Sequence, residues 1–138
     1  MTSRIRRVTT VLAGFVGVTA VLGGVELVTG YPVQQPVEWL AGTPFDSYLV
    51  PGLLLAAAVG GSAVLAFVAA IRSDPRWPRA AIVAGVVLCG WIVAEMVMLD
   101  QPTTPTVAEV GYLLVGACLV ALGWRATAAA PEPGEESR

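Results

Sequence analysis

The stretch PGLLLAAAVGGSAVLAFVAAI, residues 51–71, holds no charged side chain and decides what kind of protein this chain is. A helix needs about 20 predominantly apolar residues to cross the hydrocarbon layer of a membrane. Only helices and closed barrels satisfy their own backbone hydrogen bonds in that layer. Because the stretch has the length and composition of one crossing, it predicts a transmembrane helix.

The composition of the whole chain extends this prediction. Its 138 residues are 56% hydrophobic and only 13% charged, with a mean hydropathy of +0.74, whereas about a quarter of the residues in a soluble domain are charged. We therefore predict an all-α fold, a bundle of four transmembrane helices within residues 1–126, followed by a disordered acidic cytoplasmic tail at residues 127–138. The expected spans are residues 8–29, 51–71, 80–99 and 107–124.

Arginine side chains predict the orientation of the bundle. The chain has no lysine, and its arginines precede the first span, fill the loop at residues 72–79 and follow the fourth span. The loops at residues 30–50 and 100–106 hold no basic residue. Basic loops stay on the cytoplasmic side during insertion. Together with an arginine-only, Ala/Val/Gly-rich composition, this predicts a bacterial cytoplasmic membrane protein with both termini in the cytoplasm and a longer first outer loop.

Prolines predict the local structure of the first outer loop. A residue before proline avoids the helical region, whereas proline is tolerated at the first position of a helix. We therefore expect Val50 to cap the second span and Pro51 to begin it, with residues 44–48 forming an ordered lip. Before the lip we expect a short interfacial helix around residues 37–41, with Trp39 and Leu40 dipping toward lipid.

Small residues predict how the helices pack. Lipid offers no hydrophobic drive for pairing, so helices associate where small residues let their backbones approach. Four-residue spacing of such residues occurs on three spans: Ala13, Gly17, Ala20 and Gly24; Gly52, Ala56 and Gly60, with Ala57 and Gly61 beside them; and Ala81, Gly85 and Cys89. We expect a compact four-helix bundle. A stripe of small residues that is not used inside the bundle could pair with a second copy of the chain, as a homodimer, or with a membrane protein partner.

Acidic side chains gather on the predicted outer half, opposite the arginines. Glu26 and Glu95 lie inside spans, each about four residues or roughly 6 Å from the outer end. An ionisable residue inside a membrane span is a functional candidate by default. With no basic residue on that half, two close carboxylates would share a proton or attract a cation. The alternative is that both reach headgroup water, or that each is protonated and bonded to a backbone carbonyl.

The neighbours of these glutamates complete a hypothetical site. Helical spacing turns Tyr112 toward the bundle, where its hydroxyl can donate to a carboxylate, and it places Trp91 on the same face as Glu95. The hypothesis is an outward-opening acidic pocket beneath the lip. Its candidate ligand- or proton-binding residues are Glu26, Glu95, Tyr112, Trp91, Asp46 and Tyr48.

The composition also argues against several kinds of cofactor, metal and catalytic site. The chain has no histidine, so histidine-ligated haem or zinc is excluded. Cys89 and Cys118 lie in apolar runs without a Cys-x-x-Cys pattern, which favours a structural role. No nucleophile and base pair, metal-ligand set or phosphate loop is present, and we expect no cofactor, no metal, no catalytic residue and no nucleic-acid partner.

Two short motifs, PFDSYLVPGLLL at residues 44–55 and GWIVAE at residues 90–95, stand out within this pattern. With its four spans and cytoplasmic termini, the chain resembles small four-helix bacterial membrane proteins of DoxX-like size and topology. It is similar to small multidrug exporters in having a glutamate in span one, but its long outer loop departs from theirs. We expect a non-enzymatic binding or accessory protein. The alternatives are a proton-coupled carrier for a cationic or amphipathic solute, and a membrane enzyme acting on a lipid or quinone headgroup.

Overall fold

The computed structural model describes residues 2–102 and 105–129. All secondary-structure elements in these residues are helices, and there are no strands among them. The elements in chain order are α1 (Thr2–Thr29), the 3₁₀ helix η1 (Val37–Leu40), α2 (Leu49–Leu54), the π-helical turn η2 (Leu55–Gly60), α3 (Gly61–Ile71), α4 (Trp77–Met98) and α5 (Val107–Ala129). Because α2, η2 and α3 follow one another without a break, they form one continuous span.

Four helices are therefore long and apolar enough to cross a membrane, which indicates a multi-pass membrane protein. They are Ser3–Thr29, Leu49–Ile71, Trp77–Met98 and Val107–Ala129. The predicted all-helical class with four spans is confirmed. The helix α5 continues to Ala129, past residue 127 where the acidic tail was predicted to begin; residues 130–138 lie outside the described part of the chain.

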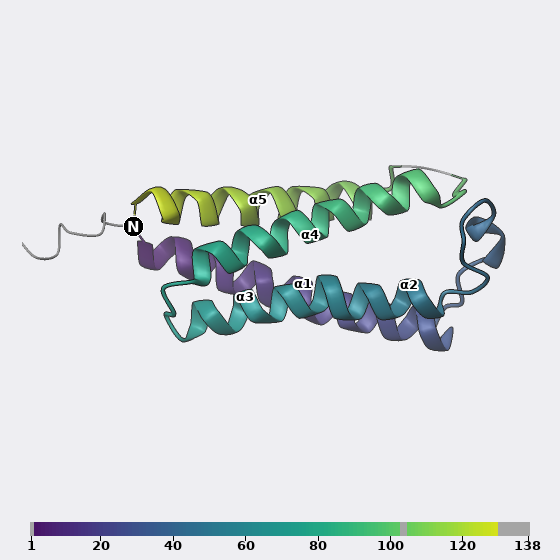
Figure 1. Cartoon of the computed structure of the whole chain (residues 1–138), viewed down its shortest axis with the longest axis horizontal. Coiled ribbons are helices and arrows are strands. Elements are labelled where there is room, and N and C mark those ends of the chain that lie inside the picture. Colours follow the sequence, from purple (N-terminus) through teal and green to yellow (C-terminus); the bar gives the residue numbers. More distant parts are fainter. Residues whose placement is uncertain (1, 103–104, 130–138) are drawn as a thin grey trace, which may run out of the picture.

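The helices run along the long axis of the molecule as two pairs (Figure 1). In one pair α1 packs along the whole second span, and in the other α4 packs along α5. The two pairs meet through α3 and α4. They separate toward the end of the bundle where residues 30–48 fold across them (Figure 1). We call this the loop end. The opposite end holds the start of α1, the end of α5 and the turn between α3 and α4. We call it the arginine end.

Two pairs of glycines allow the close packing within the helix pairs. A Cβ atom on Gly24 would lie 2.6 Å from the carbonyl oxygen of Gly52, and one on Gly85 would lie 2.5 Å from the carbonyl oxygen of Gly116. Both distances are shorter than any ordinary contact, so each site requires glycine. The close approach predicted for these stripes is thereby confirmed, whereas Gly61 has open space beside it.

Replacing Gly85 by alanine should lower the free energy of unfolding by about 1 to 3 kcal/mol, because the new methyl group meets backbone rather than a flexible side chain. Gly90→Ala is the matched control on the same helix, since nothing lies within 4 Å of that position. We expect it to be neutral or slightly stabilising. Thermal unfolding of both variants in the same detergent checks this, and equal midpoints would mean that α4 and α5 do not approach as described.

Helix starts differ from the sequence prediction for simple physical reasons. The second span begins at Leu49, with Tyr48 as its N-cap, and not at Pro51 with Val50 as cap. The first four N–H groups of a helix have no partner inside it, so proline fits anywhere in that turn. Likewise α1 begins at Thr2, well before residue 8, because no proline or glycine interrupts the residues ahead of the apolar run.

The loop at residues 30–48 folds back over the end of the bundle. The Tyr48 hydroxyl donates a 2.6 Å hydrogen bond to the Pro36 carbonyl, and the Asp100 N–H donates a 2.9 Å bond to the Trp39 carbonyl. The expected interfacial helix is present as η1, but the prediction that Trp39 and Leu40 dip toward lipid is wrong. Trp39 and the buried Leu40 turn inward, because the separated helix pairs offer them an apolar space to fill.

Candidate functional site

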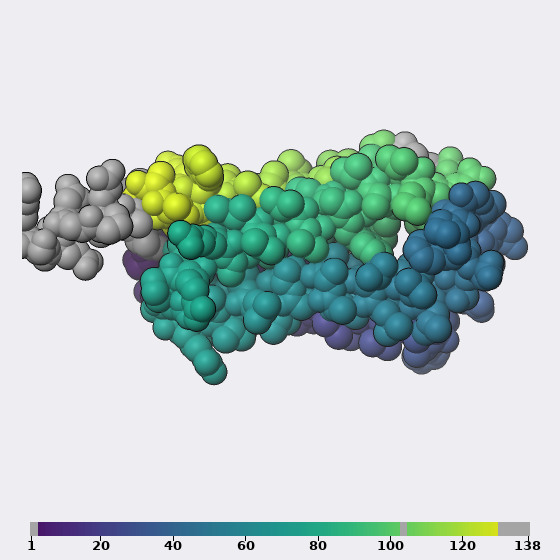
Figure 2. All heavy atoms as spheres, viewed as in Figure 1, coloured from purple at the N-terminus to yellow at the C-terminus, as the bar shows by residue number. Residues whose placement is uncertain are grey.

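A cavity of about 770 Å³ lies at the loop end, between the two helix pairs and beneath residues 30–48. Figure 2 shows the molecule hollowed there, between the blue loop and the green end of α4. Small-molecule sites usually have volumes of about 300 to 1,000 Å³. The inner part of the cavity is apolar and is formed by Val16, Val59, Leu88 and Ile92. The volume of this cavity lies within that range.

Three glutamates line the cavity, each from a different helix. Glu26 comes from α1, Glu95 from α4 and Glu109 from α5, and none of the lining residues is basic. The arginines of the described chain lie within or beside the terminal turns and the α3–α4 loop, at the other end of the bundle. The cavity therefore concentrates negative charge without a cationic side chain to neutralise it.

The structure brings five of the six predicted site residues to this cavity. Glu26, Glu95, Trp91, Tyr112 and Tyr48 all line it. Asp46 does not: it is exposed on the lip, outside the lining. Whether the five bind a ligand or a proton stays a prediction.

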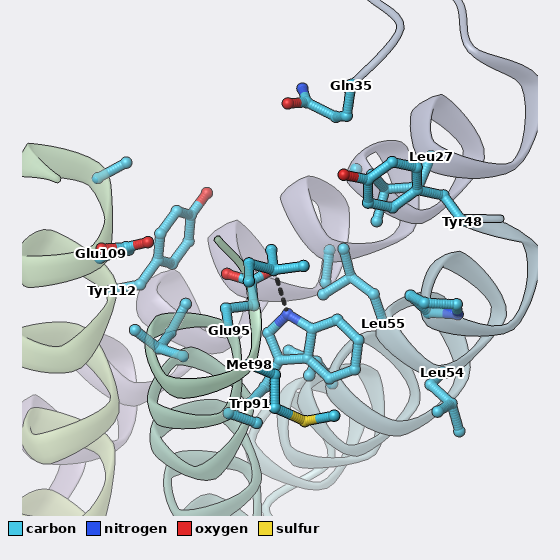
Figure 3. A pocket seen from close by; sticks show the side chains of 18 of the residues that line it. Leu27, Gln35, Tyr48, Leu54, Leu55, Trp91, Glu95, Met98, Glu109 and Tyr112 are labelled. Carbon is cyan, nitrogen blue, oxygen red and sulfur yellow. Dashed lines mark hydrogen bonds between the residues drawn. The ribbon is translucent and has the colours of Figure 1, made fainter. Parts of the chain in front are cut away.

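Trp91 and Glu95 act as one unit, because they lie one helical turn apart on α4. The indole Nε1 of Trp91 donates a 2.9 Å hydrogen bond to Oε1 of Glu95 (Figure 3). Neighbours at this spacing face the same side of a helix. Because an indole N–H lies in the ring plane, the bond fixes the carboxylate at the edge of the Trp91 ring, so that one side of the site combines a carboxylate with an aromatic surface.

Glu109 is held by a capping box that the sequence interpretation missed. Its side chain is only 5% exposed. Its Oε2 accepts a 2.8 Å hydrogen bond from the Thr106 N–H, its own N–H donates to Thr106 Oγ1 at 3.2 Å, and Gln101 Nε2 donates to its Oε1 at 3.2 Å. The signal was present as TVAE, a threonine followed three residues later by glutamate. A negative charge at this position is also stabilised by the N-terminus of α5.

Two tyrosines add hydroxyl groups to the cavity. Burial, together with the charges of Glu38 and Glu95, raises the pKa of Tyr48, so its hydroxyl stays a neutral donor to the Pro36 carbonyl. Tyr112 stacks on Phe15 of α1, with ring centroids 6.0 Å apart and an interplanar angle of 17°. Figure 3 shows the Tyr112 ring between Glu109 and Glu95. Both rings therefore have fixed positions before any ligand arrives.

The π-helical turn η2 shapes the cavity wall opposite Trp91. Leu55 and Val59 of this turn line the cavity. A π turn holds more residues per turn than an α-helix, and such turns are frequent at functional sites. No residue pattern in LAAAVG distinguishes it from ordinary α-helix, so the sequence carried no signal for it.

Comparisons of the chain with protein families, curated proteins and solved structures gave no match. The resemblance to DoxX-like proteins is thus not supported by a family match. The four apolar helices indicate a small membrane protein. Among residues 2–102 and 105–129, no three His, Cys, Asp or Glu side chains group closely enough to hold a metal ion. The three cavity glutamates are therefore not grouped closely enough to hold a metal ion together.

Proposed function

We propose that this protein is a non-enzymatic binding protein of the bacterial cytoplasmic membrane whose acidic cavity takes a largely apolar organic cation. One observation carries the proposal, namely that carboxylates and aromatic rings converge on a single cavity whose lining has no basic residue. The aromatic residues are Trp39, Phe45, Tyr48, Trp91 and Tyr112.

This combination of groups favours a cation of low polarity. A positive charge is attracted to the face of an aromatic ring, and recognition of quaternary ammonium groups by aromatic cages is the best-known use of that attraction. The glutamates add charge in a setting partly shielded from water, where it acts more strongly than in bulk water. The apolar inner wall accommodates hydrocarbon.

The packing below the cavity supports a binding role over a carrier role. Between the cavity and the arginine end, the core is filled by buried side chains, including Ala63, Ala66, Ala84 and Leu119. A Cβ on Gly123 would already lie 2.5 Å from the Pro78 carbonyl oxygen. A carrier would have to separate these backbones to open a path, whereas a binding protein keeps them together.

The distribution of charge supports an outward-facing cavity. Residues 8–71 and 80–124 contain no basic residue, so every charged side chain at the loop end is acidic. By the positive-inside rule the arginine end stays in the cytoplasm. A cavity at the loop end then opens to the outside of the cell.

The test compares two ions of the same shape and opposite charge. We expect the purified protein in detergent to bind tetraphenylphosphonium and to ignore tetraphenylborate, with heats corrected by titration of empty micelles. In the Trp91→Phe variant the accompanying change in tryptophan fluorescence should shrink, because that indole lies in the cavity. Equal affinity for the two ions, or no binding of either, would overturn the proposal.

A further inference from the structure

The cavity also opens sideways, between α2 and α4. Leu54 of α2 and Met98 of α4 both line the cavity, yet they are 46% and 42% exposed. Side chains that face a cavity and the exterior at once mark its rim. Figure 2 shows the hollow beside the green end of α4, and Figure 3 draws Leu54 and Met98 among the side chains that line the cavity. We call this opening the α2–α4 window.

The window exists because α4 packs against the α3 and η2 parts of the second span but not against its α2 part. The contacts of α4 with that span run through α3 and η2, so the short α2 segment stands apart from it. On the opposite side of the bundle, Phe15 of α1 stacks on Tyr112 of α5 and joins those two helices. The Phe15–Tyr112 contact thus joins α1 to α5, whereas α2 and α4 have no such joint at the level of the cavity.

The window lies at the level of the membrane. Leu54 is five residues inside the span that starts at Leu49, or roughly 7.5 Å along the helix axis. The rim is apolar, formed by Pro51, Leu54, Ala94 and Met98. Since the outside of these helices is covered by lipid, the window connects the cavity to the hydrocarbon of one leaflet.

Polarity inside the cavity changes along its depth. Toward the loops its lining is polar, with Gln35, Gln101, Thr106 and Glu109; toward the middle of the bundle it is apolar, with Val59, Leu88 and Ile92. A molecule that matches both parts has a cationic headgroup and a hydrocarbon chain. Such molecules dissolve in membranes and are scarce in water.

We infer that the ligand is a single-chain cationic amphiphile that enters from the lipid bilayer through the α2–α4 window. The inference rests on the proposed function, because it takes the cavity as the binding site for a cation. The headgroup lies among Glu95, Glu109 and Trp91, and the chain follows the apolar wall toward Val59 and Leu88.

The test closes the window with the double variant Leu54→Trp, Met98→Trp in protein reconstituted into lipid vesicles. The control is Leu53→Trp, Val97→Trp, which adds the same two indoles at exposed neighbouring positions outside the cavity lining. Association is followed by stopped-flow fluorescence with hexadecyltrimethylammonium, which resides in the membrane, and with tetraethylammonium, which is dissolved in water. Closing the window should slow association of the hexadecyl compound by about tenfold or more relative to the control, and leave that of tetraethylammonium within about twofold.

The outcomes separate this inference from the proposed function. If the control protein binds both cations and the closed window slows neither, entry through the window is wrong and the binding role stands. If the control protein binds neither cation, the proposed function fails and the inference with it. Leu54→Phe, Met98→Phe fills the same opening with smaller rings and replaces the tryptophan pair if that pair does not fold.

Discussion

Replacing Glu95 by glutamine should weaken binding of tetraphenylphosphonium by at least about tenfold, since removing one partner of a desolvated charge pair costs on the order of 2 kcal/mol or more. The substitution removes charge and little else. The glutamine Oε1 still accepts the hydrogen bond from Trp91 Nε1, which is 2.9 Å long in the wild-type protein. Isothermal titration of both proteins measures the difference, and unchanged thermal unfolding shows that the fold is intact.

The matched control for this variant is Asp46→Asn, which removes one carboxylate from the same end of the molecule. Asp46 is exposed on the lip and does not line the cavity, so its charge is screened by solvent. We expect its loss to change the affinity less than twofold. A general attraction of cations to an acidic surface would instead weaken binding equally in both variants, and that result would remove Glu95 from the site.

Cysteine labelling should give an all-or-none answer on orientation. In a background with Cys89→Ala and Cys118→Ala, a cysteine replacing Asp46 should react with a membrane-impermeant maleimide in intact bacterial cells. A cysteine replacing Pro75 in the α3–α4 loop should react only after the membrane is permeabilised. Both positions are exposed, so accessibility depends on the side of the membrane alone.

The reason for this expectation is the placement of arginine. Arg72, Arg76 and Arg79 flank Pro75, whereas the loop that holds Asp46 has no basic residue. Translocating such a basic loop is disfavoured. Labelling of Pro75→Cys in intact cells would invert the topology and place the acidic cavity on the cytoplasmic side.

The sequence predicts the helical architecture well because one physical requirement controls it. A hydrocarbon layer demands long apolar helices, and four such runs are visible directly in the composition. The small-residue spacing also predicts where backbones approach closely, as at Gly24, Gly52 and Gly85, although not which helices pair. These features depend on local pattern and on the solvent, both of which can be read from the chain.

The site is less predictable because it depends on how the helix pairs separate. Helical spacing and depth identify Glu26, Glu95, Trp91 and Tyr112 as members of one region, and all four line the cavity. The third carboxylate at the cavity, that of Glu109 on α5, was not among the predicted site residues. The role of Glu109 was open to prediction from its capping box, but Glu109 lies at the very start of its span and was not chosen as a candidate.

Two other features had no signal in the residues. The inward turn of Trp39 follows from the gap between the helix pairs, which is a property of the whole bundle and not of the outer loop. The π turn η2 depends on how the second span packs against α1, which it contacts along its length. In both cases tertiary packing decides between local structures of similar energy, and no local pattern records the choice.

The most direct test of the central claim, that the acidic cavity binds a cation, is to locate the bound ion. Tetraphenylarsonium has the shape and charge of tetraphenylphosphonium, and its arsenic atom gives an anomalous X-ray signal. In crystals of the complex, the account predicts an arsenic peak inside the cavity, beside Trp91 and between Glu95 and Glu109. A peak at the exposed carboxylates of the loops or on the lipid-facing surface, with the cavity unoccupied, would contradict it.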